Sequence, residues 1–233
     1  LHSDTHSFPT RRSSDLISHP DPVYQGQFGE YTITPADRRG VVLYRVGLAV
    51  AALAFATATG LGLALSDKGA VLYSLSGLYT LFWLGLGLSL ATIHIYLIPL
   101  HRLLQSFWLI GGVASLAIAH YGEGPFVVTV VQSPQTVWGV GFTFAALTGI
   151  YFKEAFCFNR LETKLLTPLV PLLLLGHLFN ILPPPGEQVL ISLWAVLFAV
   201  FALRKAVQPL VPDIGDKSVF EYLKQGQHSS SAA

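Results

Sequence analysis

Three kinds of residue are scarce in this sequence: methionine is absent, cysteine occurs once, at Cys157, and only 12% of the residues are charged. A soluble domain carries about a quarter charged residues. Here the charges fall in clusters separated by long uncharged stretches, and 52% of the chain is hydrophobic. This distribution indicates an integral membrane protein rather than a soluble domain. The single cysteine excludes an internal disulfide framework.

The sequence also lacks the motifs that carry common catalytic chemistry. It contains no H-E-x-x-H zinc motif, no phosphate-binding loop, no Ser-His-Asp arrangement and no paired intramembrane carboxylates. No acidic residue lies at the centre of a predicted span, which weighs against a proton- or sodium-coupled pump. The net charge of +1 provides no basic field that would attract nucleic acid. We therefore expect a protein that is not an enzyme and does not bind nucleic acid.

Residues 1–16 do not resemble a natural N-terminus. No methionine opens the chain, and the run SFPTRRSSDL at 7–16 looks like a translated sequencing adapter. We interpret residues 1–16 as an artefact, with a disordered polar tail as the alternative, and exclude them from the fold argument.

Long uncharged stretches predict an all-α fold, a single bundle of six transmembrane helices. A helix that crosses the bilayer needs roughly 20 apolar residues. The predicted spans are 41–65, 73–100, 103–120, 136–152, 165–182 and 188–204. The last stretch is short, and snorkelling of Arg204 and Lys205 to the interface would extend it.

Lysine and arginine predict the orientation of this bundle. Outside residues 1–16 they precede or open span 1, lie between spans 2 and 3 or between spans 4 and 5, or lie at or after the end of span 6, with the exception of Lys68. Positive residues are retained in the cytoplasm. We therefore expect both termini to be cytoplasmic, with a short arm at 17–40, a membrane domain at 41–204 and a tail at 205–233.

Small residues at four-residue spacing suggest where helices approach one another closely. The two sets are Ala56, Gly60 and Ala64 in span 1, and Gly141, Ala145 and Gly149 in span 4. Such residues let helix backbones pack together in lipid. Between spans 3 and 4, residues 126–131 are apolar but too short to cross, so we expect them at the interface or folded back on the bundle.

One group of polar residues is predicted at the cytoplasmic edge. It comprises His94, His101 and Arg102 at the end of span 2, and Glu154, Cys157 and Arg160 after span 4. The two histidines are seven residues apart, and the glutamate and cysteine are three apart, so each pair is expected on one helix face. The group is a candidate site for a metal, a cofactor or an anionic head group. The alternative is that these are ordinary edge residues that set topology.

A second set of candidates lies in span 5. His177 is an intramembrane ionisable residue, a type that is often functional, although one hydrogen bond to a neighbouring helix also satisfies it. Pro168 and Pro171 each remove a helix hydrogen bond, so the span is a candidate hinge or cavity wall. Haem ligation by His94 and His177 is conceivable, but the predicted spans put them at depths roughly 8 Å apart.

Two segments carry a resemblance to a known family. They are HIYLIPLHR at 94–102 and FKEAFCFNRLETK at 152–164, the latter running into LLTPLVPLLLLGHLF at 165–179. They resemble an uncharacterised integral membrane family typical of cyanobacteria, domain-of-unknown-function family 2301, over residues 25–221. The resemblance implies a plasma (inner) or thylakoid membrane and supplies neither an activity nor catalytic residues.

Three functions remain open at this point. The leading hypothesis is a non-enzymatic accessory or assembly factor that binds other membrane proteins through small-residue helix faces. The second is a small-solute permease built around the proline-containing span 5. The third is a haem-, metal- or quinone-binding protein that uses His94, His101 and Cys157. The sequence does not identify a cofactor.

Overall fold

The computed structural model describes residues 22–65, 69–122 and 124–230, and for 224–230 it describes the backbone alone. The chain divides into two compact units, residues 35–215 and the two segments that flank them. We describe each unit by itself.

The larger unit is helical. Its long helices are α1 (Pro35–Leu65), α2 (Gly69–Thr92), α3 (Ile98–Tyr121), α5 (Val137–Phe158), α6 (Leu161–Leu178) and α7 (Pro184–Val207). Its short helices are α4 (Phe126–Gln132), the 3-10 turn η1 (Pro134–Thr136) and α8 (Val211–Ile214). These bounds confirm the all-α fold class.

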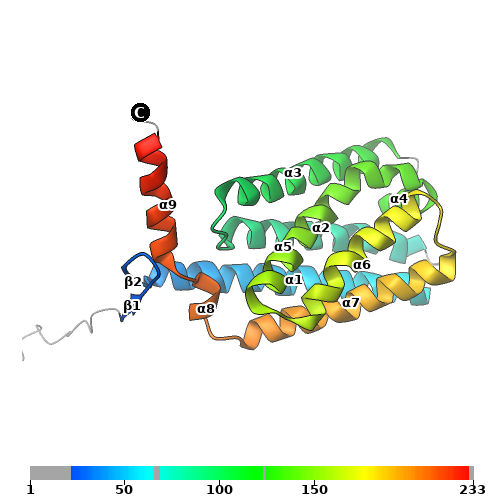
Figure 1. Cartoon of the computed structure of the whole chain (residues 1–233). Helices are drawn as coiled ribbons and strands as arrows, with labels where there is room; N and C mark the ends of the chain where they lie inside the picture. Colours follow the sequence, from blue (N-terminus) through cyan, green and yellow to red (C-terminus); the bar gives the residue numbers. More distant parts are fainter. Residues whose placement is uncertain (1–21, 66–68, 123, 231–233) are drawn as a thin grey trace, which may run out of the picture. The chain divides into compact units, whose positions relative to one another are not determined.

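The six long helices lie side by side in one bundle (Figure 1), and their contacts close into a ring. Each contacts the next along the chain, and α7 returns to contact α1. The chain alternates direction, so α1 begins and α7 ends at the same end of the unit, where α8 contacts α1. We call this the α8 end, and the opposite end, where α4 packs against α2 and α3, the α4 end.

The outer surface of the ring is apolar. Leu53 on α1, Leu116 on α3 and Leu203 on α7 are 69%, 71% and 69% exposed. Large leucine-rich surfaces of this kind are rare on soluble monomers and suit contact with lipid. Five helices, α1, α2, α3, α6 and α7, are long and apolar enough to cross a membrane within the described residues.

Helix α5 is the long helix that does not meet this apolar criterion. It packs between α3 and α6 and buries polar groups such as Thr143 and Glu154. Lys153 and Glu154 near its C-terminal end lower its mean hydropathy. Both neighbours run antiparallel to it, and α5 therefore also runs the length of the bundle.

Close backbone contacts join the ring. A Cβ added to Gly47 on α1 would lie 2.5 Å from the carbonyl oxygen of Gly85 on α2, so only glycine fits there. The predicted small-residue set on α5 is partly used, because Gly149 packs against the Leu104 side chain of α3. In the set predicted on α1, Gly60 has no atom near its Cβ position and faces outward.

The predicted second span is wrong at its C-terminal end. Helix α2 ends at Thr92, residues 93–97 are not helical, and α3 begins at Ile98. Pro99 occupies the first turn of α3, where its missing amide costs no helix hydrogen bond, whereas inside one continuous span it would remove one. His94 and His101 therefore do not share a helix face.

The smaller unit pairs the N-terminal hairpin with the C-terminal helix. Strands β1 (Val23–Gln25) and β2 (Glu30–Thr32) are antiparallel, and α9 spans Lys217–Ser230. The loop between the strands binds the start of α9: the Gln27 amide donates to Asp216 Oδ2 at 2.6 Å, and the Phe28 amide donates to Ser218 Oγ at 3.0 Å.

Candidate functional site

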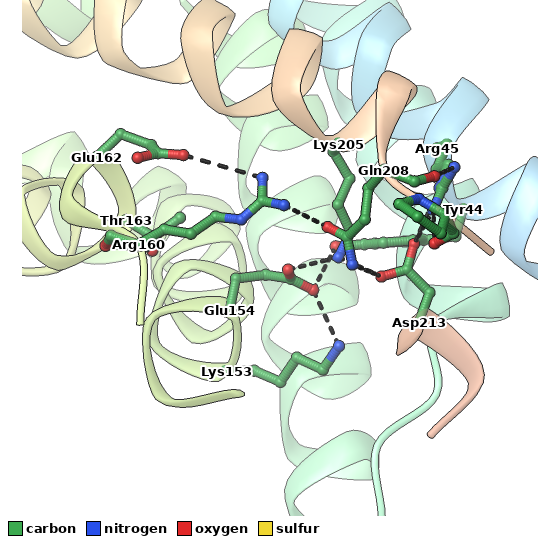
Figure 2. Close-up of polar contacts among 11 residues, drawn as sticks. Tyr44, Arg45, Lys153, Glu154, Arg160, Glu162, Thr163, Lys205, Gln208 and Asp213 are labelled. Atoms are coloured by element: carbon green, nitrogen blue, oxygen red, sulfur yellow. Dashed lines mark hydrogen bonds and ion pairs between the residues drawn. The ribbon is translucent and has the colours of Figure 1, made fainter. Parts of the chain in front are cut away.

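A cluster of charged side chains is buried at the α8 end of the bundle (Figure 2). The ionic cluster comprises Arg45 on α1, Lys153 and Glu154 on α5, Lys205 on α7, and Asp213 on α8. Buried charges are stable only when they are paired and hydrogen-bonded. The cluster therefore joins α1 and α5 to α7 and α8, which lie far from them in the sequence.

Lys205 stands at the centre of the ionic cluster and is fully buried. Its Nζ donates to Glu154 Oε2 at 2.6 Å and to Asp213 Oδ1 at 2.5 Å. The same nitrogen lies 4.1 Å from the centre of the Phe158 ring, within the range of a cation–π interaction. The sequence analysis expected Lys205 to snorkel to the interface; that expectation is wrong, because two carboxylates and an aromatic ring compensate its burial.

Both carboxylates have further partners. Glu154 Oε1 accepts from Lys153 Nζ at 2.9 Å and from the Tyr44 hydroxyl at 3.1 Å. Asp213 Oδ2 accepts from Arg45 Nε at 2.9 Å and from its Nη2 at 2.6 Å. Each carboxylate therefore binds Lys205 through one oxygen and a second cation through the other.

Arg160 and Glu162 form a second charged pair beside the ionic cluster, and some of its polar atoms have no hydrogen-bond partner. Arg160 donates from Nη2 to Gln208 Oε1 at 2.5 Å, and Glu162 accepts from Arg204 at 2.9 Å. Arg160 Nη1 and Glu162 Oε1 lie 4.0 Å apart, and each is buried without a hydrogen-bond partner. The polar contacts thus continue from α8 to the start of α6.

The structure separates the polar residues predicted to face one another. Glu154 and Arg160 join the charged groups just described, whereas Cys157 is exposed on α5. His101 instead bonds within its own hairpin, with Nε2 2.6 Å from the Leu90 carbonyl oxygen, and Arg102 bonds Gln105 on the same helix. In the part of the chain that the structure describes, no three His, Cys, Asp or Glu side chains are placed to hold a metal.

His94 and His177 lie toward opposite ends of the bundle. A Cβ on Gly40, near the start of α1, would lie 3.5 Å from His94 Cε1. His177 lines a cavity together with Thr59, 19 residues further along α1. At 1.5 Å per residue this separation is roughly 28 Å. The depth difference of roughly 8 Å that the predicted spans gave for His94 and His177 is therefore much too small. The two histidines cannot bind the two faces of one haem.

Sequence reasoning missed Tyr44, Arg45, Lys205 and Asp213 as members of one group. Most of their partners are distant in the sequence; 168 residues separate Arg45 from Asp213, although only eight separate Lys205 from Asp213. Each alone looks like an ordinary helix-end residue. The sequence offered one signal for such a group: carboxylates and cations are frequent at the helix ends that the ring topology brings to the same end of the bundle.

A large apolar cavity occupies the α4 end of the bundle. Its volume is about 690 Å³. Residues from α1, α2, α4, α5, α6 and α7 line it, among them Ala58, Leu75, Val131, Val140, Leu174 and Ile191. Small-molecule sites in proteins have volumes of about 300–1,000 Å³ and are lined mainly by apolar side chains. The cavity has the size and chemistry of such a site.

Aromatic rings close the cavity toward the middle of the bundle. Phe55 lies 4.5 Å from Trp194 between ring centres, and Phe144 lies 5.3 Å from Trp194 and 5.7 Å from Phe82. These spacings are typical of packed aromatic pairs. We call these four residues the aromatic floor; it separates the cavity from the ionic cluster.

A polar pair lies in the opposite wall of the cavity. His177 Nδ1 is 2.8 Å from Glu187 Oε1, and both side chains line the cavity. The other ring nitrogen, Nε2, lies 3.5 Å from the Val130 carbonyl oxygen, at the outer limit for a hydrogen bond.

His177, which the sequence analysis singled out in a candidate cavity wall, therefore lines a cavity, and Leu173 and Leu174 of the same helix line it too. Pro168 and Pro171 lie inside α6 and are not among the residues that line it.

A family model for uncharacterised integral membrane proteins (DUF2301) matches residues 88–222, more than half of the chain. The chain belongs to this family. The matched region spans α3 to α7, most of the ionic cluster, and the polar pair at His177 and Glu187. No curated protein and no solved structure matches the chain. The family establishes an integral membrane protein and assigns it no activity.

Proposed function

We propose that this protein is a non-enzymatic membrane protein that binds an apolar small molecule in the cavity at the α4 end of its bundle. The cavity of about 690 Å³ carries this proposal. Helices that cross the bilayer line it, so an apolar ligand reaches it from the lipid rather than from water. An accessory role in a membrane complex, the leading hypothesis from the sequence, is compatible with a protein that holds such a ligand for a partner.

A permease is the weaker alternative. Transport requires a path to the α8 end, and two layers lie in the way. The aromatic floor closes the cavity, and beyond it Lys205, Glu154 and Asp213 are buried and joined by short ion pairs. Opening that end would separate buried charges, at several kcal/mol for each ion.

The ring topology supports the proposed orientation, with both termini in the cytoplasm. The α8 end carries Arg45, Arg102, Lys153, Arg160 and Lys205. In residues 35–65, 69–122 and 124–215, no lysine or arginine lies at the α4 end. With positive residues retained on the cytoplasmic side, the proposed orientation would put the cavity toward the other face of a plasma or thylakoid membrane.

A cavity-filling variant tests the ligand proposal. Ala58 lines the cavity on α1, and Leu53 on the same helix is 69% exposed on the outer surface. We expect wild-type protein and Leu53→Phe, purified in mild detergent, to yield one apolar compound in near-equimolar amount by mass spectrometry of organic extracts. Ala58→Phe should retain several-fold less. Equal yields from all three proteins, or no enriched compound in any of them, would contradict the proposal.

A further inference from the structure

The Val130 carbonyl oxygen, in the last turn of α4, has no backbone donor. In a continuous helix the amide four residues further on would bond it, but that residue is Pro134, which has no amide proton. The Thr136 hydroxyl lies 3.5 Å from this oxygen and 2.7 Å from the Ser133 carbonyl oxygen, so its single proton goes to Ser133. Among the described residues, the donor that remains for the Val130 carbonyl is His177 Nε2 at 3.5 Å.

His177 therefore lies between two acceptors. Its Nδ1 is 2.8 Å from Glu187 Oε1, and its Nε2 faces the Val130 carbonyl oxygen. A neutral imidazole has one N–H and donates to one of them, whereas an imidazolium has two and donates to both. The arrangement with both bonds corresponds to protonated His177. When the ring is neutral, the bond to the carboxylate retains the remaining proton because it is the stronger one, and the Val130 carbonyl loses its donor.

Helix α4 forms one wall of the cavity and is held at both of its ends. Most of its side chains line the cavity. At its start, Phe126 is buried, and its ring centre lies 4.8 Å from that of Tyr79 on α2. At its C-terminal end, the bond from His177 to Val130 joins α4 to α6, and Glu187 extends the connection to α7. Loss of that bond frees the C-terminal end while Phe126 still holds the start.

We infer that α4 is a pH-sensitive gate of the cavity. Protonated His177 holds the C-terminal end of α4 against α6 and α7, and loss of the proton releases that end and opens the cavity. This inference rests on the proposed function and names the regulation of its site. Ligand exchange is therefore slow at acidic pH and faster at alkaline pH.

The other ionisable groups around the ring are few. Among the described residues that line the cavity, α7 contributes Glu187 and α2 contributes Tyr79, and those of α1, α4 and α5 carry no ionisable side chain. Neither does η1, which packs against α6. The Tyr79 hydroxyl bonds Ser115 Oγ at 2.7 Å, and tyrosine side chains are ordinarily neutral below pH 8. Histidine side chains ordinarily change charge between pH 5 and 8, so these two values are compared.

Release of a bound hydrocarbon tests the gate in the full chain, reconstituted in lipid nanodiscs. The protein is loaded with deuterated decane, mixed with excess empty liposomes and recaptured at timed intervals, and the retained decane is quantified by mass spectrometry. Decane in the nanodisc lipid leaves in a fast phase that Ala58→Phe shares, so the slow phase measures the cavity. One hydrogen bond contributes about 0.5–1.5 kcal/mol, so the slow phase should be about 2- to 12-fold faster at pH 8 than at pH 5.

Variants separate this inference from the proposed function. In His177→Phe the slow phase should have the same rate at both pH values, close to the wild-type rate at pH 8. His120→Phe is the matched control, because His120 is an exposed histidine near the end of α3, and it should keep the wild-type pH dependence. A wild-type slow phase with equal rates at pH 5 and pH 8, or a pH dependence that persists in His177→Phe, would overturn the inference alone. Absence of a slow phase from the wild type at both pH values would overturn the proposed function and the gate with it.

A distance measurement tests the movement of α4 with His177 in place and no ligand added. Spin labels are attached at Val131→Cys on α4 and Leu203→Cys on α7, both exposed positions, in a Cys157→Ser background. Double electron–electron resonance should give one narrow distance distribution at pH 5 and a second population at pH 8. The same distribution at both pH values would overturn the gate, even if the release of decane varied with pH.

Discussion

Replacing Lys205 with methionine tests whether the ionic cluster stabilises the bundle. The change removes the charge and keeps most of the apolar side chain. It deletes the ion pairs to Glu154 and Asp213 at 2.6 and 2.5 Å, together with the contact to the Phe158 ring at 4.1 Å. Both carboxylates then remain buried with one cation fewer.

The expected loss follows from this geometry. Removing one partner of a buried ion pair costs about 3–5 kcal/mol, because the remaining charge stays desolvated. Glu154 keeps Lys153 as a partner and Asp213 keeps Arg45. These remaining cations place the expected loss at the lower end, about 3 kcal/mol of the free energy of unfolding.

Reversible unfolding by SDS in mixed micelles, followed by circular dichroism, measures this difference. Lys164→Met is the matched control, because Lys164 is exposed on α6. Its free energy of unfolding should stay within about 0.5 kcal/mol of wild type. In the double variant Lys205→Met with Glu154→Gln, the loss should be smaller than the sum of the single losses by about 0.5–3 kcal/mol.

Two results would refute this reasoning. A Lys205→Met protein within about 1 kcal/mol of wild type would mean that water, rather than Lys205, compensates the carboxylates. Strict additivity with Glu154→Gln would mean that the 2.6 Å ion pair contributes no coupling energy.

Three further predictions are independent of the ionic cluster. Cys157 is exposed, so a membrane-impermeant maleimide should label it in inside-out vesicles and not in intact right-side-out vesicles; the reverse pattern would invert the proposed orientation. Deletion of residues 1–16, which lie outside the described residues, should leave expression and helix content unchanged by circular dichroism. Hydrogen bonds from the Ser218 hydroxyl and the Gln27 amide lower the pKa of the Asp216 carboxyl below its ordinary value of 3.8. The stabilisation that these bonds give is therefore complete above pH 3.8. It is lost as the pH falls through the lower pKa of the folded state. Asp216→Ala should speed hydrogen exchange of the Gln27 amide at neutral pH, and the difference should vanish at strongly acidic pH.

The sequence by itself determined that this chain is a bundle of apolar helices. Long uncharged stretches such as 46–66 predict membrane helices, because a helix satisfies the backbone amides and carbonyls within its own segment, as lipid requires. Hydropathy also placed five of the six long helices to within several residues at most ends. It missed the break at 93–97, because a window of apolar residues does not distinguish a helix from a short extended connector.

Only the tertiary structure decided which polar residues act together. Arg45 pairs with Asp213 and Lys205 with Glu154 because the closed ring brings α1, α5, α7 and α8 to one end. His177 gains its significance from a cavity whose walls come from six different helices. Pair contacts and cavities are properties of packed surfaces, and helical periodicity along one segment carries no information about the segment opposite. Hydrophobicity along the sequence therefore determines where the helices form. The packing of the helices into a ring determines which buried charges contact one another and where the cavity lies.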